Sequence, residues 1–144
     1  MEETNLSQSM EDYIEAIHIL EKNNKVARVT DVGKELNVKK ASVVAALNYL
    51  KSINVITHEH YGYITLTRKG REIAERIYRK HKILYDFLTN TLNVDKAKAK
   101  EEACAIEHAL SEDTIEKLVS FVKQANYLLR KNKKTKKKSN IYNL

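Results

Sequence analysis

Cys104, Glu107 and His108 bring three kinds of metal-binding side chain into one short stretch of the sequence. In an α-helix, positions three and four apart lie on the same face, so a helix here would direct a thiolate, a carboxylate and an imidazole towards one point. Such a mixed donor set suits a transition metal of borderline softness. The alternative is a small buried cysteine beside two solvated polar residues, and the C-x-x-E-H pattern taken alone favours that simpler interpretation.

Two further carboxylates, Asp12 and Glu15, lie three positions apart in another stretch with helical spacing. This helix is expected to begin near Ser9, whose hydroxyl can cap it. Its apolar residues recur at the spacing of a core-facing stripe: Met10, Tyr13, Ile14, Ile17 and Leu20. Asp12 and Glu15 share a neighbouring face. His18 completes an E-x-x-H pattern with Glu15, but a di-iron bundle needs that pattern twice, so His18 is interpreted as a solvent-facing or packing residue.

Charge is unevenly distributed along the 144 residues, whose net charge is +7. Residues 130–138 carry seven cations and no anion, whereas residues 25–82 carry thirteen cations and five anions. Residues 1–24 and 83–129 are both net acidic. A basic segment between acidic segments is typical of a polyanion-binding module joined to a part that attracts cations. No apolar run approaches a membrane span, and a single cysteine fits a reducing, cytoplasmic location.

The basic segment has the order of elements of a winged helix. Two short helices, from about Asp31 to Leu36 and from about Lys40 to Ser52, flank a tight turn. Two β-branched and aromatic stretches follow, with Gly62 in the connection between them. The alternative is another small α+β unit. His58 and His60 would lie in the wing, where phosphate contact suits them better than metal binding.

Three more helices are expected after the hairpin, capped by Thr67, Asp95 and Ser111. The predicted fold is therefore mainly α with a small β-hairpin. It comprises a winged helix-turn-helix DNA-binding domain at residues 1–72, a helical dimerisation and metal-binding domain at 73–130, and a basic, disordered tail at 131–144.

Five motifs occur in an order that resembles one family. They are Ser9-Met-Glu-Asp12-Tyr-Ile-Glu15-Ala-Ile, Val29-Thr-Asp-Val-Gly-Lys-Glu-Leu36, Leu66-Thr-Arg-Lys-Gly-Arg-Glu-Ile-Ala74, Arg79-Lys-His81-Lys-Ile-Leu and Glu102-Ala-Cys104-Ala-Ile-Glu-His108-Ala-Leu-Ser111. From Ser9 to Leu129, the chain resembles the diphtheria-toxin-repressor family of metal-dependent transcriptional repressors, in the short two-domain branch of manganese transport regulators.

The resemblance implies a metal site with six ligands from three helices: Asp12, Glu15, His81, Cys104, Glu107 and His108. The implied cofactor is Mn(II) or Fe(II), with Zn(II) or Co(II) able to bind in vitro. Manganese-type members often carry a carboxylate at the position of Cys104, and iron-type members carry methionine at that of Asp12, so this chain mixes both donor sets. The acid and histidine of the iron-type ancillary site are replaced by Tyr85 and Lys100.

The implied function is a repressor of metal uptake genes that binds a palindromic operator in double-stranded DNA as a homodimer. Exposed positions of the helix-turn-helix and wing supply the candidate DNA contacts: Arg28, Thr30, Lys39, Lys40, Ser42, Asn48, His60 and Tyr61. No enzymatic activity, small organic substrate or membrane association is expected. Two alternatives remain, namely a winged-helix regulator that does not sense metal and a small metalloenzyme, which would need a general base and a substrate cleft.

Overall fold

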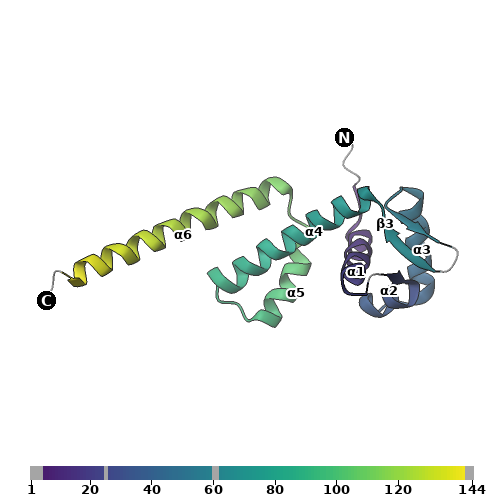
Figure 1. The fold of residues 1–144 in the computed structure, drawn as a ribbon, viewed down its shortest axis with the longest axis horizontal. Coiled ribbons are helices and arrows are strands. Elements are labelled where there is room, and N and C mark those ends of the chain that lie inside the picture. Colours follow the sequence, from purple (N-terminus) through teal and green to yellow (C-terminus); the bar gives the residue numbers. More distant parts are fainter. Residues whose placement is uncertain (1–4, 25, 60–61, 142–144) are drawn as a thin grey trace. The chain divides into compact units, whose positions relative to one another are not determined.

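The structure, a computed structural model, describes residues 5–24, 26–59 and 62–141. Helices dominate this part of the chain, and the strands form one small sheet (Figure 1). This confirms the predicted mainly α fold with a β-hairpin. The elements in order are α1 (Gln8–Asn24), β1 (Ala27–Arg28), α2 (Val29–Leu36), α3 (Lys40–Ser52), β2 (Ile56–His58), β3 (Tyr63–Leu66), α4 (Arg68–Asp86), the π-helical turn η1 (Phe87–Thr91), α5 (Lys96–Glu107) and α6 (Glu112–Ile141).

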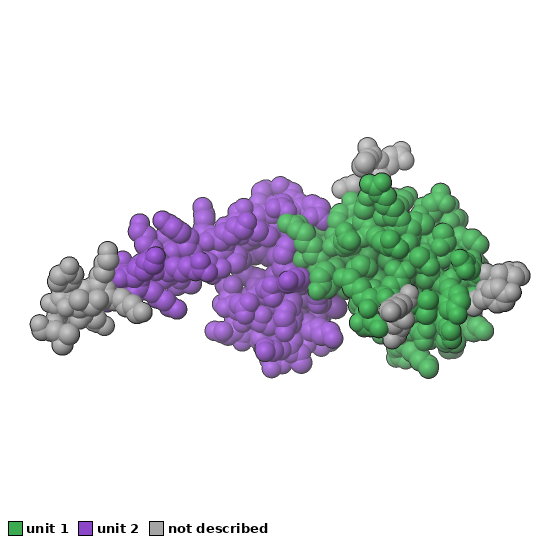
Figure 2. All heavy atoms as spheres, viewed as in Figure 1, with its two compact units in different colours: residues 1–80 green, residues 81–144 purple. Residues whose placement is uncertain are grey.

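The chain divides into two compact units, Met1–Lys80 and His81–Leu144, which Figure 2 colours separately. The core of the first unit contains the predicted stripe of α1, in which Ile14 and Ile17 are fully buried. Val43, Leu47 and Leu50 of α3 pack into the same core, as their spacing predicts. Glu21 of α1 also accepts a hydrogen bond from the Leu66 amide at 2.9 Å. The first helix is therefore joined to the sheet by apolar packing and by a polar contact.

The turn between α2 and α3 is short and crowded. Asn37 adopts a left-handed conformation with φ 53°, which asparagine tolerates better than most residues. The Val38 amide then donates to the Gly33 carbonyl at 3.0 Å. A Cβ atom at Gly33 would lie 3.2 Å from the Val38 carbonyl oxygen, so a side chain at residue 33 would press on the backbone of the turn.

The sheet has one more strand than the predicted hairpin. Strand β3 lies in the centre, antiparallel to β2 on one side and to β1 on the other. Strand β1 pairs Ala27 with Ile64 and Arg28 with Tyr63. This pairing fixes the start of α2, which follows β1 directly and begins at Val29 instead of the expected Asp31.

The second unit is built around a smaller core, to which α4, η1, α5 and α6 contribute Leu84, Leu88, Ala99, Ala103 and Ile115. Asp95 caps α5, its carboxylate accepting from the Ala97 amide at 3.2 Å, and Ser111 Oγ accepts from the Thr114 amide at 3.2 Å. Helix α6 continues to Ile141, which differs from the disordered tail expected from residue 131. Lysine is a good helix former, and neither glycine nor proline interrupts the run.

No helix within the described ranges combines the length and apolar content that crossing a bilayer requires.

A first prediction concerns Gly70, where α4 passes close to Val55 in the connection between α3 and β2. A Cβ atom there would lie 2.1 Å from the Val55 carbonyl oxygen, a backbone atom that cannot move aside by rotation. We expect Gly70→Ala to lower the free energy of unfolding by about 1–3 kcal/mol, despite the better helix propensity of alanine. Urea denaturation measures this change. The control is Arg76→Ala on the exposed side of α4, for which a change within about 0.5 kcal/mol is expected.

A second prediction concerns His18, which is buried, as the packing interpretation required. Burial, and next the nearby Lys22, lower the pKa of His18 below its usual value. The unfolded chain therefore takes up this proton at a higher pH than the folded chain does, and the free energy of unfolding falls as the pH drops below about 6.5. Urea denaturation at about pH 7.5 and about pH 5.5 should show a larger loss for the natural protein than for His18→Gln. Equal losses would contradict this assignment.

Candidate metal centre and nucleic-acid interface

Glu107 stands at the end of a row of buried residues on α5. Ala99, Ala103 and Glu107 lie four positions apart and are all buried, so Glu107 occupies a core-facing position. Cys104, in contrast, is exposed. The simpler interpretation of this stretch, a buried cysteine beside solvated polar residues, is therefore wrong, because the thiol is accessible and the carboxylate is enclosed.

His81, near the end of α4, meets both of these side chains. Its Nδ1 lies 2.7 Å from Glu107 Oε2 and 3.6 Å from Cys104 Sγ. Ligand atoms of His81, Cys104 and Glu107 all lie within 4.8 Å of one another. The second unit thus brings an imidazole, a thiol and a carboxylate together at one point. The imidazole is that of His81 and not that of His108, which the helical spacing had placed beside Cys104 and Glu107.

The second oxygen of Glu107 has no hydrogen-bond donor among the described residues. The Glu107 side chain is fully buried, and its Oε1 lies 3.4 Å from His108 Nε2 without the alignment of a hydrogen bond. A buried charged oxygen is unfavourable unless it is paired, and a metal ion is one of the partners that natural proteins use for this purpose. The residues present therefore fit a divalent cation.

The other candidate ligands belong to different elements. Asp12 and Glu15 are half-buried on α1 in the first unit, on a face beside the buried stripe, as expected. His108 directly follows α5 as its C-cap. The spacing of residues did not point to His81. Only the family motif singled it out, because 26 positions separate it from Glu107.

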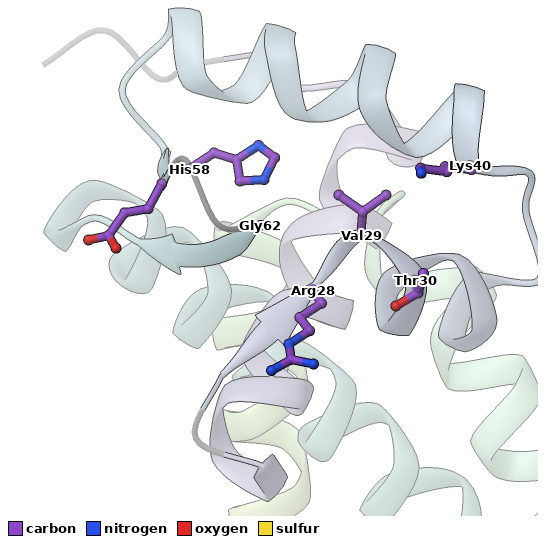
Figure 3. A pocket seen from close by; sticks show the side chains of 7 residues that line it. Arg28, Val29, Thr30, Lys40, His58 and Gly62 are labelled. Atoms are coloured by element: carbon purple, nitrogen blue, oxygen red, sulfur yellow. The ribbon is translucent and has the colours of Figure 1, made fainter.

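A groove lies between the start of the helix-turn-helix and the wing (Figure 3). It has a volume of about 530 Å³ and is lined by Arg28, Val29, Thr30, Lys40, His58, Glu59 and Gly62. Three of these, Arg28, Thr30 and Lys40, are candidate DNA contacts. The Arg28 guanidinium stacks over the Tyr63 ring, 5.3 Å from its centroid, so the cation is held beside the groove and exposed. His58 supplies a further imidazole.

The other candidate DNA contacts lie along α3 or outside the described residues. Lys39 precedes α3 as its N-cap, and Ser42 and Asn48 are exposed on it. His60 and Tyr61 lie outside the described residues. The exposed side of α3 thus carries polar groups that are not required by the core.

Comparison with known proteins covers both units. Residues 5–64 match the iron dependent repressor N-terminal DNA binding domain, and residues 67–134 match the iron dependent repressor metal binding and dimerisation domain. The chain is 40% identical over 120 residues to an uncharacterized HTH-type transcriptional regulator of Methanocaldococcus jannaschii, covering 83% of this chain and 96% of that protein. It is 34% identical over 114 residues to the HTH-type transcriptional regulator MntR of Lysinibacillus sphaericus, covering 79% of this chain and 81% of that protein.

Among solved structures, T. acidophilum IdeR is similar with a TM-score of 0.71 and 29% identity. The match covers 85% of this chain and 55% of that one, so the chain spans about half the length of that solved regulator. These findings confirm the resemblance found in the five motifs. The chain belongs to the iron-dependent repressor family, whose members are metal-responsive transcriptional repressors with a DNA-binding domain followed by a metal-binding and dimerisation domain.

Proposed function

We propose that this protein is a homodimeric repressor that binds a palindromic operator when it is loaded with Mn(II) or Fe(II), and that it controls metal uptake genes. The observation that carries the proposal is the buried, incompletely paired carboxylate of Glu107 beside His81 and Cys104. The exposed groove of the winged helix supports the DNA-binding part of the proposal.

The proposed ligands are Asp12, Glu15, His81, Cys104, Glu107 and His108. Together they offer carboxylates, imidazoles and one thiolate, a mixed set that accepts Mn(II), Fe(II), Co(II) or Zn(II), so donor softness does not choose among these ions. A bound divalent cation would supply the positive charge that Glu107 Oε1 lacks. Asp12 and Glu15 would add charge from α1, and through them the DNA-binding unit would respond to the occupancy of the site.

Repulsion among carboxylates explains why the ion would be needed. Asp12, Glu15 and Glu107 repel one another when they approach, so the arrangement that joins α1 to α5 is disfavoured without a cation. Metal binding then shifts the equilibrium by its preference for that arrangement, typically about 1–3 kcal/mol for such couplings. By reciprocity, operator DNA would tighten metal binding to the same extent.

Operator recognition would use the exposed side of α3 in the major groove. Ser42 and Asn48 can exchange hydrogen bonds with base edges, whereas Lys39 and Lys40 contribute phosphate contacts. A symmetric dimer places two such helices on the two halves of a palindrome. The exposed apolar side chains Phe121, Leu128 and Leu129 of α6 supply surface that a second subunit can cover.

The third prediction tests the metal site through Glu107. Operator affinity, measured on a duplex selected from a random pool, should rise about 5–150-fold when Mn(II) replaces a chelator. Glu107→Gln removes the buried charge but keeps the shape, so the variant should bind DNA weakly and should respond little to Mn(II). The control is Glu102→Gln, which changes a partly exposed carboxylate on the same helix and should leave the response intact.

Two outcomes would separate the alternatives. If Glu107→Gln responds as strongly as the natural protein, Glu107 is not a ligand. If the natural protein binds its operator equally well with chelator and with each of Mn(II), Fe(II), Co(II) and Zn(II), the chain is a winged-helix regulator that does not sense metal.

The fourth prediction tests the groove. Arg28→Gln and Lys40→Gln each remove one cation that lines it. Each substitution should weaken binding to operator and unrelated duplexes alike. It should also make the slope of log K against log salt less negative by about 1. Fluorescence anisotropy across a salt series measures both quantities, with Lys117→Gln on α6 as a control for charge. Selective loss for the operator alone would instead assign that side chain to base reading.

A further inference from the structure

The C-terminal part of α6 is a strongly charged surface that the metal site and the helix-turn-helix do not use. Near its start, Ile115 is buried in the core of the second unit, and Leu118 and Val119 pack against that core. From residue 126 to residue 136 every position is exposed. Figure 1 shows this end of the helix extending away from α5. The side chains from Arg130 onward in this segment therefore face solvent, beyond the apolar residues that a second subunit can cover.

The charge of this segment is of one sign. Residues 130–138 contain seven cations and no anion. In the helix, Arg130, Lys133 and Lys134 are related by three and four positions, and Lys136 follows Lys133 by three, so these side chains form one continuous exposed band. Like charges at this spacing destabilise a helix by a few tenths of a kcal/mol per pair. Binding of a polyanion would remove this repulsion.

The composition of the segment favours nucleic acid over a lipid surface. Helices that lie on membranes need an apolar face opposite their cations, and no apolar residue stands between Arg130 and Asn140. Duplex DNA requires no such face, because it presents closely spaced phosphates that release counterions when cations neutralise them. The same chain carries a DNA-binding domain, so the two surfaces can act on one ligand.

We propose that the basic band of α6, from Arg130 to Lys136, is a second, sequence-independent binding surface for duplex DNA phosphates. This inference rests on the DNA binding of the family but not on the metal response. The band adds affinity for any duplex, and α3 retains the reading of bases. Because its contribution is electrostatic, it is strong at low salt and weakens steeply as salt is added.

The experiment compares full-length proteins on operator and scrambled duplexes across a salt series. In one variant Lys131, Lys133, Lys134 and Lys136 are changed to Gln; in the matched control the same four become Arg. If each lysine neutralises one phosphate, the slope of log K against log salt should become less negative in the Gln variant, by about 3.6 per subunit on both duplexes. It should stay unchanged in the Arg variant, and the fold-response of operator binding to Mn(II) should stay unchanged in both.

Three results would overturn the inference. The first is an unchanged slope in the Gln variant. The second is a loss of affinity that is confined to the operator duplex. The third is lysine-dependent binding of the natural protein to phosphatidylserine vesicles that equals its binding to scrambled duplex at the same salt. The readouts also separate this inference from the metal proposal. If the Gln variant shows a smaller salt dependence and the natural protein does not respond to Mn(II), the band is supported and the metal proposal fails. If the salt dependence is unchanged and the natural protein responds to Mn(II), the metal proposal stands and the band is rejected.

Discussion

The burial of the Glu107 carboxylate is the constraint on which the second unit depends. An uncompensated buried charge costs several kcal/mol. Here one oxygen has a hydrogen-bond partner, His81 Nδ1 at 2.7 Å, and the other lies 3.4 Å from His108 Nε2 without a hydrogen bond. The fold nevertheless places this residue in line with Ala99 and Ala103 on the core-facing side of α5. A carboxylate that is buried and incompletely paired is an unfavourable arrangement of the kind that proteins keep at functional sites.

The surrounding elements hold the donor atoms in place. Asp95 fixes the start of α5 through the Ala97 amide, and the small side chains of Ala99 and Ala103 let the helix pack closely in the core. Glu107 and Cys104 then project from the last turns of a helix that is anchored at its other end. His81 lies on α4, and Leu84 of the same helix packs in the same core. Both sides of the cluster therefore depend on one set of apolar contacts.

Local signals predicted the fold well, and long-range pairing explains what they missed. Thr67, Asp95 and Ser111 cap helices as their residue types suggest. Ser9 does not cap α1 as expected, because the helix begins at Gln8 and the Met10 amide donates to Ser7 Oγ. Strand β1 was not predicted because two residues give no periodicity and their pairing with β3 joins Ala27 to the distant Ile64. The meeting of His81 with Cys104 is equally non-local. The π-helical turn after α4 also lacked a signal, since the spacing of apolar residues continues through it.

The crowded turn between α2 and α3 has a consequence for how such a regulator diversifies. The reversal is defined by backbone atoms of Gly33, Asn37 and Val38, with little space for any added side chain. The tilt of α3 is thereby set independently of the residues on its solvent side, such as Ser42 and Asn48. Substitutions at these solvent-facing positions can therefore alter what the helix contacts without disturbing the backbone that orients it.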